Sequence, residues 1–155
     1  NYKIYSELFE NQISSFSFFV KTATSISGDD VKLTERLSMP SKKLRGFVRG
    51  KVGPKDGNDY IGGNFVTSIN LQTSLPILFE NSQNLDAVIF FDAANIWGVD
   101  YDSSIDDARK IRSSIGIGVD YLTVVGPLSF SLSQVISKSD NDVEETFRFN
   151  LGTTF

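Results

Sequence analysis

Cysteine and histidine are both absent from this chain of 155 residues. Without cysteine, the chain has no disulfide framework and no thiolate metal site. Without histidine, it lacks the imidazole base of serine hydrolase triads and the commonest metal ligand. Most ordinary hydrolytic mechanisms thereby lose their usual base, so we expect no enzyme activity, no catalytic residues, no bound metal and no cofactor.

Long apolar runs and a strong positive charge are missing as well. No stretch approaches the roughly 18–20 consecutive apolar residues that a membrane-spanning helix needs. A membrane-spanning strand needs only about 9–11 residues with every second one apolar, so residence in a membrane stays open. The net charge of -4 gives no broad basic surface, and we expect no nucleic-acid partner. The chain begins with Asn1 and shows no signal peptide, so we expect a piece of a longer protein.

Aromatic and β-branched residues, by contrast, recur in short runs that alternate with polar residues. Phenylalanine is frequent, at 13 residues, and this composition favours strands. The best helical candidate, Ser104–Arg109, is short and is expected to lie in a loop. The period-two pattern predicts strands at 2–10, 15–26, 62–75, 86–96, 111–123, 127–137 and 146–155.

The polar face of these strands is rich in serine, glycine, asparagine and glutamine. Small uncharged residues suit the inside of a β-barrel, with the apolar face toward lipid. The alternation alone is equally compatible with a soluble antiparallel sheet whose apolar residues pack inward. Long polar connections at 28–64, 100–110 and 137–145 alternate with short ones such as Val124–Pro127. Because outer-membrane barrels pair short periplasmic turns with long outer loops, we predict an all-β, transmembrane, antiparallel up-and-down β-barrel.

The chain ends in an amphipathic strand. Phe147, Phe149, Leu151 and Phe155 share one face of it. Bacterial outer-membrane barrels commonly end in such a strand, which serves as their assembly signal. The alternative is a soluble domain that ends with an edge strand.

Several motifs together resemble one family. Leu44-Arg45-Gly46-Phe47 resembles the Arg-Gly-aromatic motif at the tip of the long loop six in BamA-type barrels of the outer-membrane protein 85 superfamily. Further stretches follow in the family's order: Gly53-Pro54, Gly62–Asn64, Phe90–Trp97, Ile111–Gly118, Gly126–Leu128 and Phe147–Phe155.

This resemblance implies a fold and a function. Residues 1–155 would be the C-terminal portion of one bacterial outer-membrane barrel domain, about the last seven of roughly sixteen strands. The first strands and the POTRA domains would lie upstream. The whole protein would fold and insert β-barrel proteins through a lateral gate, with unfolded outer-membrane proteins as substrates. Accessory assembly lipoproteins and outer-membrane lipid would be its partners. Alternatives are a translocation barrel of the TamA or two-partner type, the barrel of a patatin-like phospholipase, and a passive porin or surface adhesin.

The resemblance also implies an anchor for loop six. Asp92 lies within an apolar strand and is expected to point inward, because a lipid-facing carboxylate is costly. The planar guanidinium of Arg45 suits a carboxylate, so we predict an Arg45–Asp92 contact. The family often has an inward glutamate where Gln72 stands, which leaves Asp92 as the main ionic partner. The alternative is a solvated Arg45, with Asp92 paired to Arg112 or Lys21.

Three further positions leave choices open. Arg49, in a second Arg-Gly step, competes with Arg45 for the anchor, although the spacing to Gly53-Pro54 favours Arg45. Ala94 stands where the family often has glycine. Trp97 and Tyr101 fall at a strand end, where they would form an interfacial aromatic belt or pack against a loop.

Overall fold

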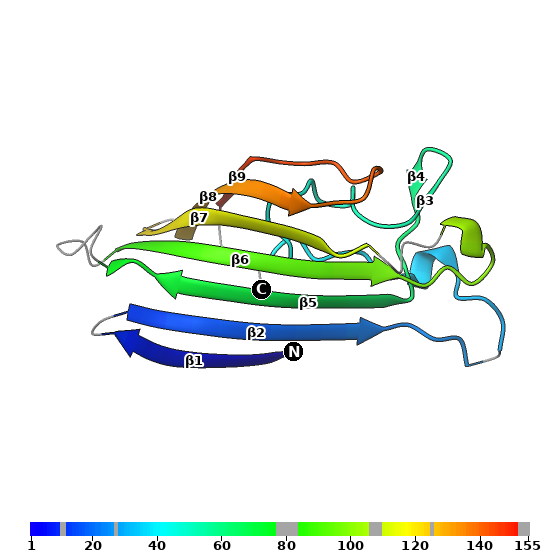
Figure 1. Ribbon diagram of the computed structural model, residues 1–155, viewed down its shortest axis with the longest axis horizontal. Helices are drawn as coiled ribbons and strands as arrows, with labels where there is room; N and C mark the ends of the chain where they lie inside the picture. The colour runs from blue at the N-terminus through cyan, green and yellow to red at the C-terminus, as the bar shows by residue number, and fades with distance from the viewer. Residues whose placement is uncertain (10–11, 27, 77–83, 106–109, 125, 152–155) are drawn as a thin grey trace.

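The computed structural model describes residues 1–9, 12–26, 28–76, 84–105, 110–124 and 126–151. Seven strands lie side by side in one sheet, in the order β1-β2-β5-β6-β7-β8-β9 (Figure 1). Every neighbouring pair is antiparallel. The strands are β1 (Tyr2–Phe9), β2 (Gln12–Thr22), β5 (Phe65–Ser74), β6 (Leu85–Trp97), β7 (Arg112–Thr123), β8 (Gly126–Ser137) and β9 (Phe147–Leu151).

All seven strands predicted from the sequence are present, with bounds that differ by a few residues. Smaller elements were not predicted: a hairpin of β3 (Lys55–Asp56) and β4 (Asp59–Tyr60), and the 3-10 turns η1 (Leu33–Glu35) and η3 (Ser103–Ile105). The helical candidate Ser104–Arg109 overlaps η3, and its residues 106–109 lie outside the described residues. No helix in the described part of the chain is long and apolar enough to cross a membrane.

The two faces of the sheet differ in polarity. The inner face carries buried polar side chains, including Ser17, Ser68, Asn70 and Ser133. The outer face carries large apolar side chains that are 36% to 52% exposed: Phe16, Phe18, Ile69, Leu71, Ile89, Ile115, Ile117, Phe130 and Leu132. A soluble sheet packs its apolar face inward, so the soluble alternative is wrong. An exposed apolar face of this kind is typical of the wall of a transmembrane β-barrel.

A long connection, residues 23–64, joins β2 to β5 and is called loop six here, after the family's loop. Within loop six, Leu37 and Gly63 exchange backbone hydrogen bonds of 2.9 and 3.0 Å, and the loop packs against the inner face of the sheet through its apolar side chains. The hydrophobic core lies between loop and sheet rather than between two sheets. Its buried members are Leu37, Met39, Leu44, Phe47 and Val52 from loop six, with Val66, Ala94 and Ile96 from the strands.

The sheet is open at both edges in the described residues, because β1 pairs only with β2, and β9 only with β8. Unpaired backbone groups are costly in lipid. We therefore expect the isolated 155-residue chain to form oligomers or aggregates in detergent rather than a closed monomer. Size-exclusion chromatography with light scattering will measure this. A monodisperse, folded monomer would contradict the prediction.

Candidate functional site

The register of the sheet places four polar side chains in a row across its inner face. Ser17 of β2 pairs with Asn70 of β5, Asn70 with Asp92 of β6, and Asp92 with Ser114 of β7. All four are buried, and Asp92 and Ser114 are 0% exposed. We call Ser17, Asn70, Asp92 and Ser114 the polar row. Because paired residues of adjacent strands share a face, one period-two pattern in each strand is sufficient to build it.

The tip of loop six lies along this row, and Arg45 binds Asp92. Its Nε donates to Asp92 Oδ2 at 2.7 Å, and its Nη2 donates to Oδ1 at 2.8 Å. The backbone N–H of Arg45 also donates to Asp92 Oδ2, at 3.1 Å. This is a bidentate, charge-assisted contact that combines geometric specificity with charge. The predicted Arg45–Asp92 contact is therefore present.

Neighbouring side chains make further contacts around Arg45 and Asp92. Gln72 accepts a hydrogen bond of 3.0 Å from Arg45 Nη1, so it contributes an acceptor but no charge. The guanidinium lies 3.5 Å from the centre of the Phe90 ring, which is a cation–π contact. Asn70 donates 2.9 Å hydrogen bonds to Asp92 Oδ1 and to the carbonyl of Lys43. Ser114 Oγ donates to the carbonyl of Arg45 at 2.6 Å.

Lys43 extends the contact to the far end of the polar row. Its Nζ donates to Ser17 Oγ at 2.8 Å. Burial lowers the pKa of Lys43 below its ordinary value, the charge of Lys3 lowers it further, and Asp92 acts in the opposite direction. Each member of the polar row therefore hydrogen-bonds the segment Lys43–Arg45.

Gly46 allows the chain to turn next to the wall. Its φ is +88°, in the left-handed region that favours glycine. An added Cβ would lie 3.1 Å from Ser114 Cβ and 3.2 Å from Ser133 Cβ, so the site is crowded as well. On either side, Leu44 and Phe47 are each 1% exposed and belong to the core. The motif thus combines two buried apolar side chains, one charged anchor and one turn.

The alternative predictions for the partner of Asp92 are wrong. Arg112 does not bind Asp92 in the structure, because it pairs with Asp142. Arg49 is exposed on loop six, and Lys21 is exposed on β2, so neither competes for the buried carboxylate. Ala94, where the family often has glycine, fits in the core at 4% exposure.

The Arg112–Asp142 pair is a second buried anchor, which was not predicted from the sequence. Both side chains are 0% exposed, and Arg112 donates to Asp142 at 2.8 Å from Nε and 3.2 Å from Nη2. Asp142 also accepts from the backbone N–H of Gly53 at 3.1 Å and of Ser139 at 2.6 Å. It therefore joins loop six to the connection between β8 and β9. The available signal was the alternation of this segment, which places Arg112 on the same face as Ser114, Gly116 and Gly118, opposite Ile115 and Ile117.

The terminal strand presents its apolar residues outward, as its alternation predicts. Phe147, Phe149 and Leu151 are 55%, 50% and 62% exposed, and the Phe149 ring lies 5.1 Å from that of Phe130. Phe155, the last residue of the predicted assembly signal, lies outside the described residues. The role of this strand in assembly stays a prediction.

Trp97 and Tyr101 have different surroundings. Trp97 stacks on Phe65 with 5.5 Å between ring centres, at the ends of β6 and β5. Tyr101 packs against loop residues, which is one of the two alternatives that the sequence left open. Its hydroxyl donates to Asp56 at 2.8 Å, which raises the pKa of Tyr101 above its ordinary value.

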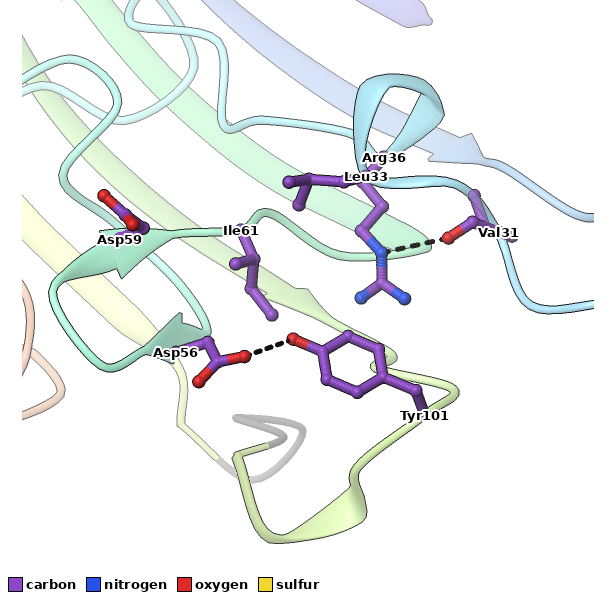
Figure 2. Close-up of a pocket in the computed structure, with 7 residues that line it drawn as sticks. All are labelled: Val31, Leu33, Arg36, Asp56, Asp59, Ile61 and Tyr101. Atoms are coloured by element: carbon purple, nitrogen blue, oxygen red, sulfur yellow. Dashed lines mark hydrogen bonds between the residues drawn. The ribbon is translucent and has the colours of Figure 1, made fainter.

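Tyr101 lines a hollow among the loops (Figure 2), and the volume of this hollow is about 570 Å³. Arg36 faces the Tyr101 ring at 5.0 Å, and its Nε donates to the carbonyl of Val31 at 3.2 Å. The hollow is lined by Val31, Leu33, Arg36, Asp56, Asp59, Ile61 and Tyr101. It belongs to the connecting loops and does not include the polar row.

Comparison with known proteins relates this geometry to a group of relatives. The chain is 26% identical over 132 residues to the outer membrane protein assembly factor BamA of Neorickettsia risticii, covering 83% of this chain and 18% of that protein. It is 27% identical over 139 residues to the protein of the same name from Neisseria meningitidis serogroup B, covering 72% and 17%. The chain thus spans less than a fifth of the length of these curated relatives.

A solved structure has the same architecture. The crystal structure of BamA from Haemophilus ducreyi lacking POTRA domains 1–3 superposes with a TM-score of 0.87 at 27% identity. The match covers 99% of this chain and 34% of that one. The strand order and the outward apolar face are therefore those of part of an outer-membrane barrel, which places the chain in the bacterial outer membrane. The Omp85 superfamily domain matches residues 1–155, and the chain belongs to that family.

Proposed function

We propose that this chain is part of an outer-membrane protein assembly factor, which folds β-barrel proteins and inserts them into the outer membrane. The observation that carries the proposal is the binding of the loop-six tip to the polar row, above all by Arg45 on Asp92. Relatives named as BamA support it. Residues 1–155 are proposed as the C-terminal portion of one barrel domain, with the first strands and POTRA domains upstream.

The proposed mechanism uses strand pairing rather than covalent chemistry, so no enzymatic step is included. An incoming barrel strand adds to an exposed sheet edge at a lateral gate by β-augmentation. Strand pairing and burial of apolar faces in lipid provide the driving force. The anchored loop fixes the shape of the inner face beside the gate. Substrates are unfolded outer-membrane proteins, with lipid and accessory lipoproteins as further partners.

The packing of loop six also helps to distinguish the proposed function from its alternatives. Its apolar residues cover the inner face and form the core, whereas a passive porin keeps a water-filled lumen. This argues against the porin. A translocation barrel of the TamA or two-partner type, or the barrel of a patatin-like phospholipase, remains the second candidate because it would share the fold.

Complementation tests the proposal. The full-length protein is expressed in cells depleted of their own assembly factor, and the amount of folded porin in the outer membrane is measured. We expect the wild type to restore folded porin and Arg45→Ala to restore less. Arg49→Ala, which changes an exposed arginine in the same loop, is the matched control. Restored secretion of an exported protein, without restored porin, would instead support the translocation alternative.

The terminal strand gives a separate prediction. Phe149 faces outward beside Phe130, so Phe149→Asp places a carboxylate against lipid. Such a change costs about 2–3 kcal/mol, and we expect it to lower the amount of folded protein in the outer membrane. Heat-modifiable migration on gels will measure the folded fraction, with Phe149→Leu as the control. Wild-type levels of folded Phe149→Asp protein would show that this face does not meet lipid.

A further inference from the structure

Arg148 points to the inner face of the terminal strand β9 and contacts loop six. Its Nη1 donates to the carbonyl of Ser41 at 2.9 Å, and its Nη2 donates to the carbonyl of Phe47. One carbonyl lies three residues before the Leu44–Phe47 motif, and the other belongs to its last residue. The side chain of Arg148 is only 11% exposed, and Glu145 compensates its charge at 2.6 Å.

The backbone reinforces this contact just before β9 begins. Glu145 N–H donates to the carbonyl of Gly46 at 2.9 Å, and Val48 N–H donates to that of Val143 at 2.9 Å. Phe47 and Glu144 form an isolated antiparallel bridge. The tip of loop six is therefore paired with the segment that leads directly into the terminal strand. The polar row holds the same tip from the other side, through β2, β5, β6 and β7.

We propose that Arg148 is a positioning residue that couples the tip of loop six to the terminal strand. The inference rests on the proposed function, in which an incoming strand adds to an exposed sheet edge, and β9 forms one edge of the sheet in the described residues. Any displacement of β9 moves Arg148, and with it the carbonyls of Ser41 and Phe47. A displacement of the β9 edge is thereby transmitted to loop six on the inner face. A movement of loop six is transmitted to β9 in the same way.

The chemistry of arginine explains why this residue can make the link. Its planar guanidinium has five N–H donors in a fixed fork, so it reaches two carbonyls and a carboxylate together. A lysine ammonium is a point charge that keeps the ion pair with Glu145 but cannot span both carbonyls in this geometry. Arg148→Lys should therefore retain part of the coupling, and Arg148→Ala should retain none.

Hydrogen exchange of the full-length protein in detergent or nanodiscs tests the coupling. In Arg148→Ala we expect the amides of Val48, Val143 and Glu145 to exchange about tenfold faster or more, because charge-assisted hydrogen bonds that hold the bridge are lost. Amides of the β5–β6 ladder should keep their wild-type rates. Arg148→Lys should give an intermediate increase. A purely structural role would accelerate exchange throughout the sheet, so the local pattern distinguishes the two.

A matched control lies in the same connection. Lys138 and Glu144 form a 2.7 Å ion pair whose side chains are 44% and 42% exposed, so Lys138→Ala should leave these amides unchanged. Unchanged exchange in Arg148→Ala, or an equal increase in every strand, overturns the coupling. The porin assay is read separately. If the wild type fails to restore porin, the proposed function fails, whereas the exchange pattern still decides the coupling.

Discussion

Replacing Arg45 with alanine is expected to lower the free energy of unfolding by about 3 kcal/mol, because it leaves a buried carboxylate without its cation. The pair is well shielded from water, since Asp92 is 0% exposed and the Arg45 side chain only 18%. Asp92 keeps hydrogen bonds from Asn70 and from the backbone at residue 45, which places the cost at the low end for a buried pair.

The measurement is urea unfolding of the full-length barrel in lipid, followed by heat-modifiable migration and paired with the porin assay. Arg45→Lys keeps the charge but loses the bidentate geometry, so an intermediate loss is expected. Asp92→Ala and the double variant complete a mutant cycle that isolates the coupling of the two side chains. Strictly additive losses, or a wild-type midpoint for Arg45→Ala, would show that the contact does not hold loop six.

The strands of this fold are predictable from the sequence because their signal is local. A period of two residues specifies both the strand and its inner face, so the alternating segments and the inward orientation of Asp92 follow directly. Gly46 is similar, because glycine is the residue that tolerates a positive φ, and its φ is +88°. The Arg45–Asp92 contact required the family resemblance, because Arg49 stood in an equivalent local pattern.

The remaining contacts depend on the path of a long loop, which carries no periodic signal. Arg112 and Asp142 are 30 residues apart and meet only because loop six and the β8–β9 connection fold over the same face. Ser41 and Arg148 are 107 residues apart. The sequence could identify Arg112 and Arg148 as charged residues on inner faces. It could not choose among the carbonyls and carboxylates that the loops bring there.

Replacing Asp142 with alanine is expected to destabilise the barrel by about 3–5 kcal/mol, since it removes a fully buried carboxylate that pairs with the guanidinium of Arg112. Two backbone N–H groups, of Gly53 and Ser139, lose their acceptor at the same time. Asn95 still accepts one hydrogen bond from Arg112, at 2.9 Å, but supplies no charge. Asp140→Ala, in the same turn but at an exposed position, is the matched control and should leave the urea midpoint unchanged.

Combining Asp142→Ala with Asp92→Ala tests whether the two anchors hold loop six as one unit. Asp92 holds the tip through Arg45, and Asp142 holds the Gly53 region of the same loop. If loss of either anchor releases much of the loop, the second loss removes contacts that are already weakened. We therefore expect the double variant to lose less stability than the sum of the single variants, by about 1 kcal/mol or more. Additive losses in urea unfolding would mean that the tip and the Gly53 region are held independently.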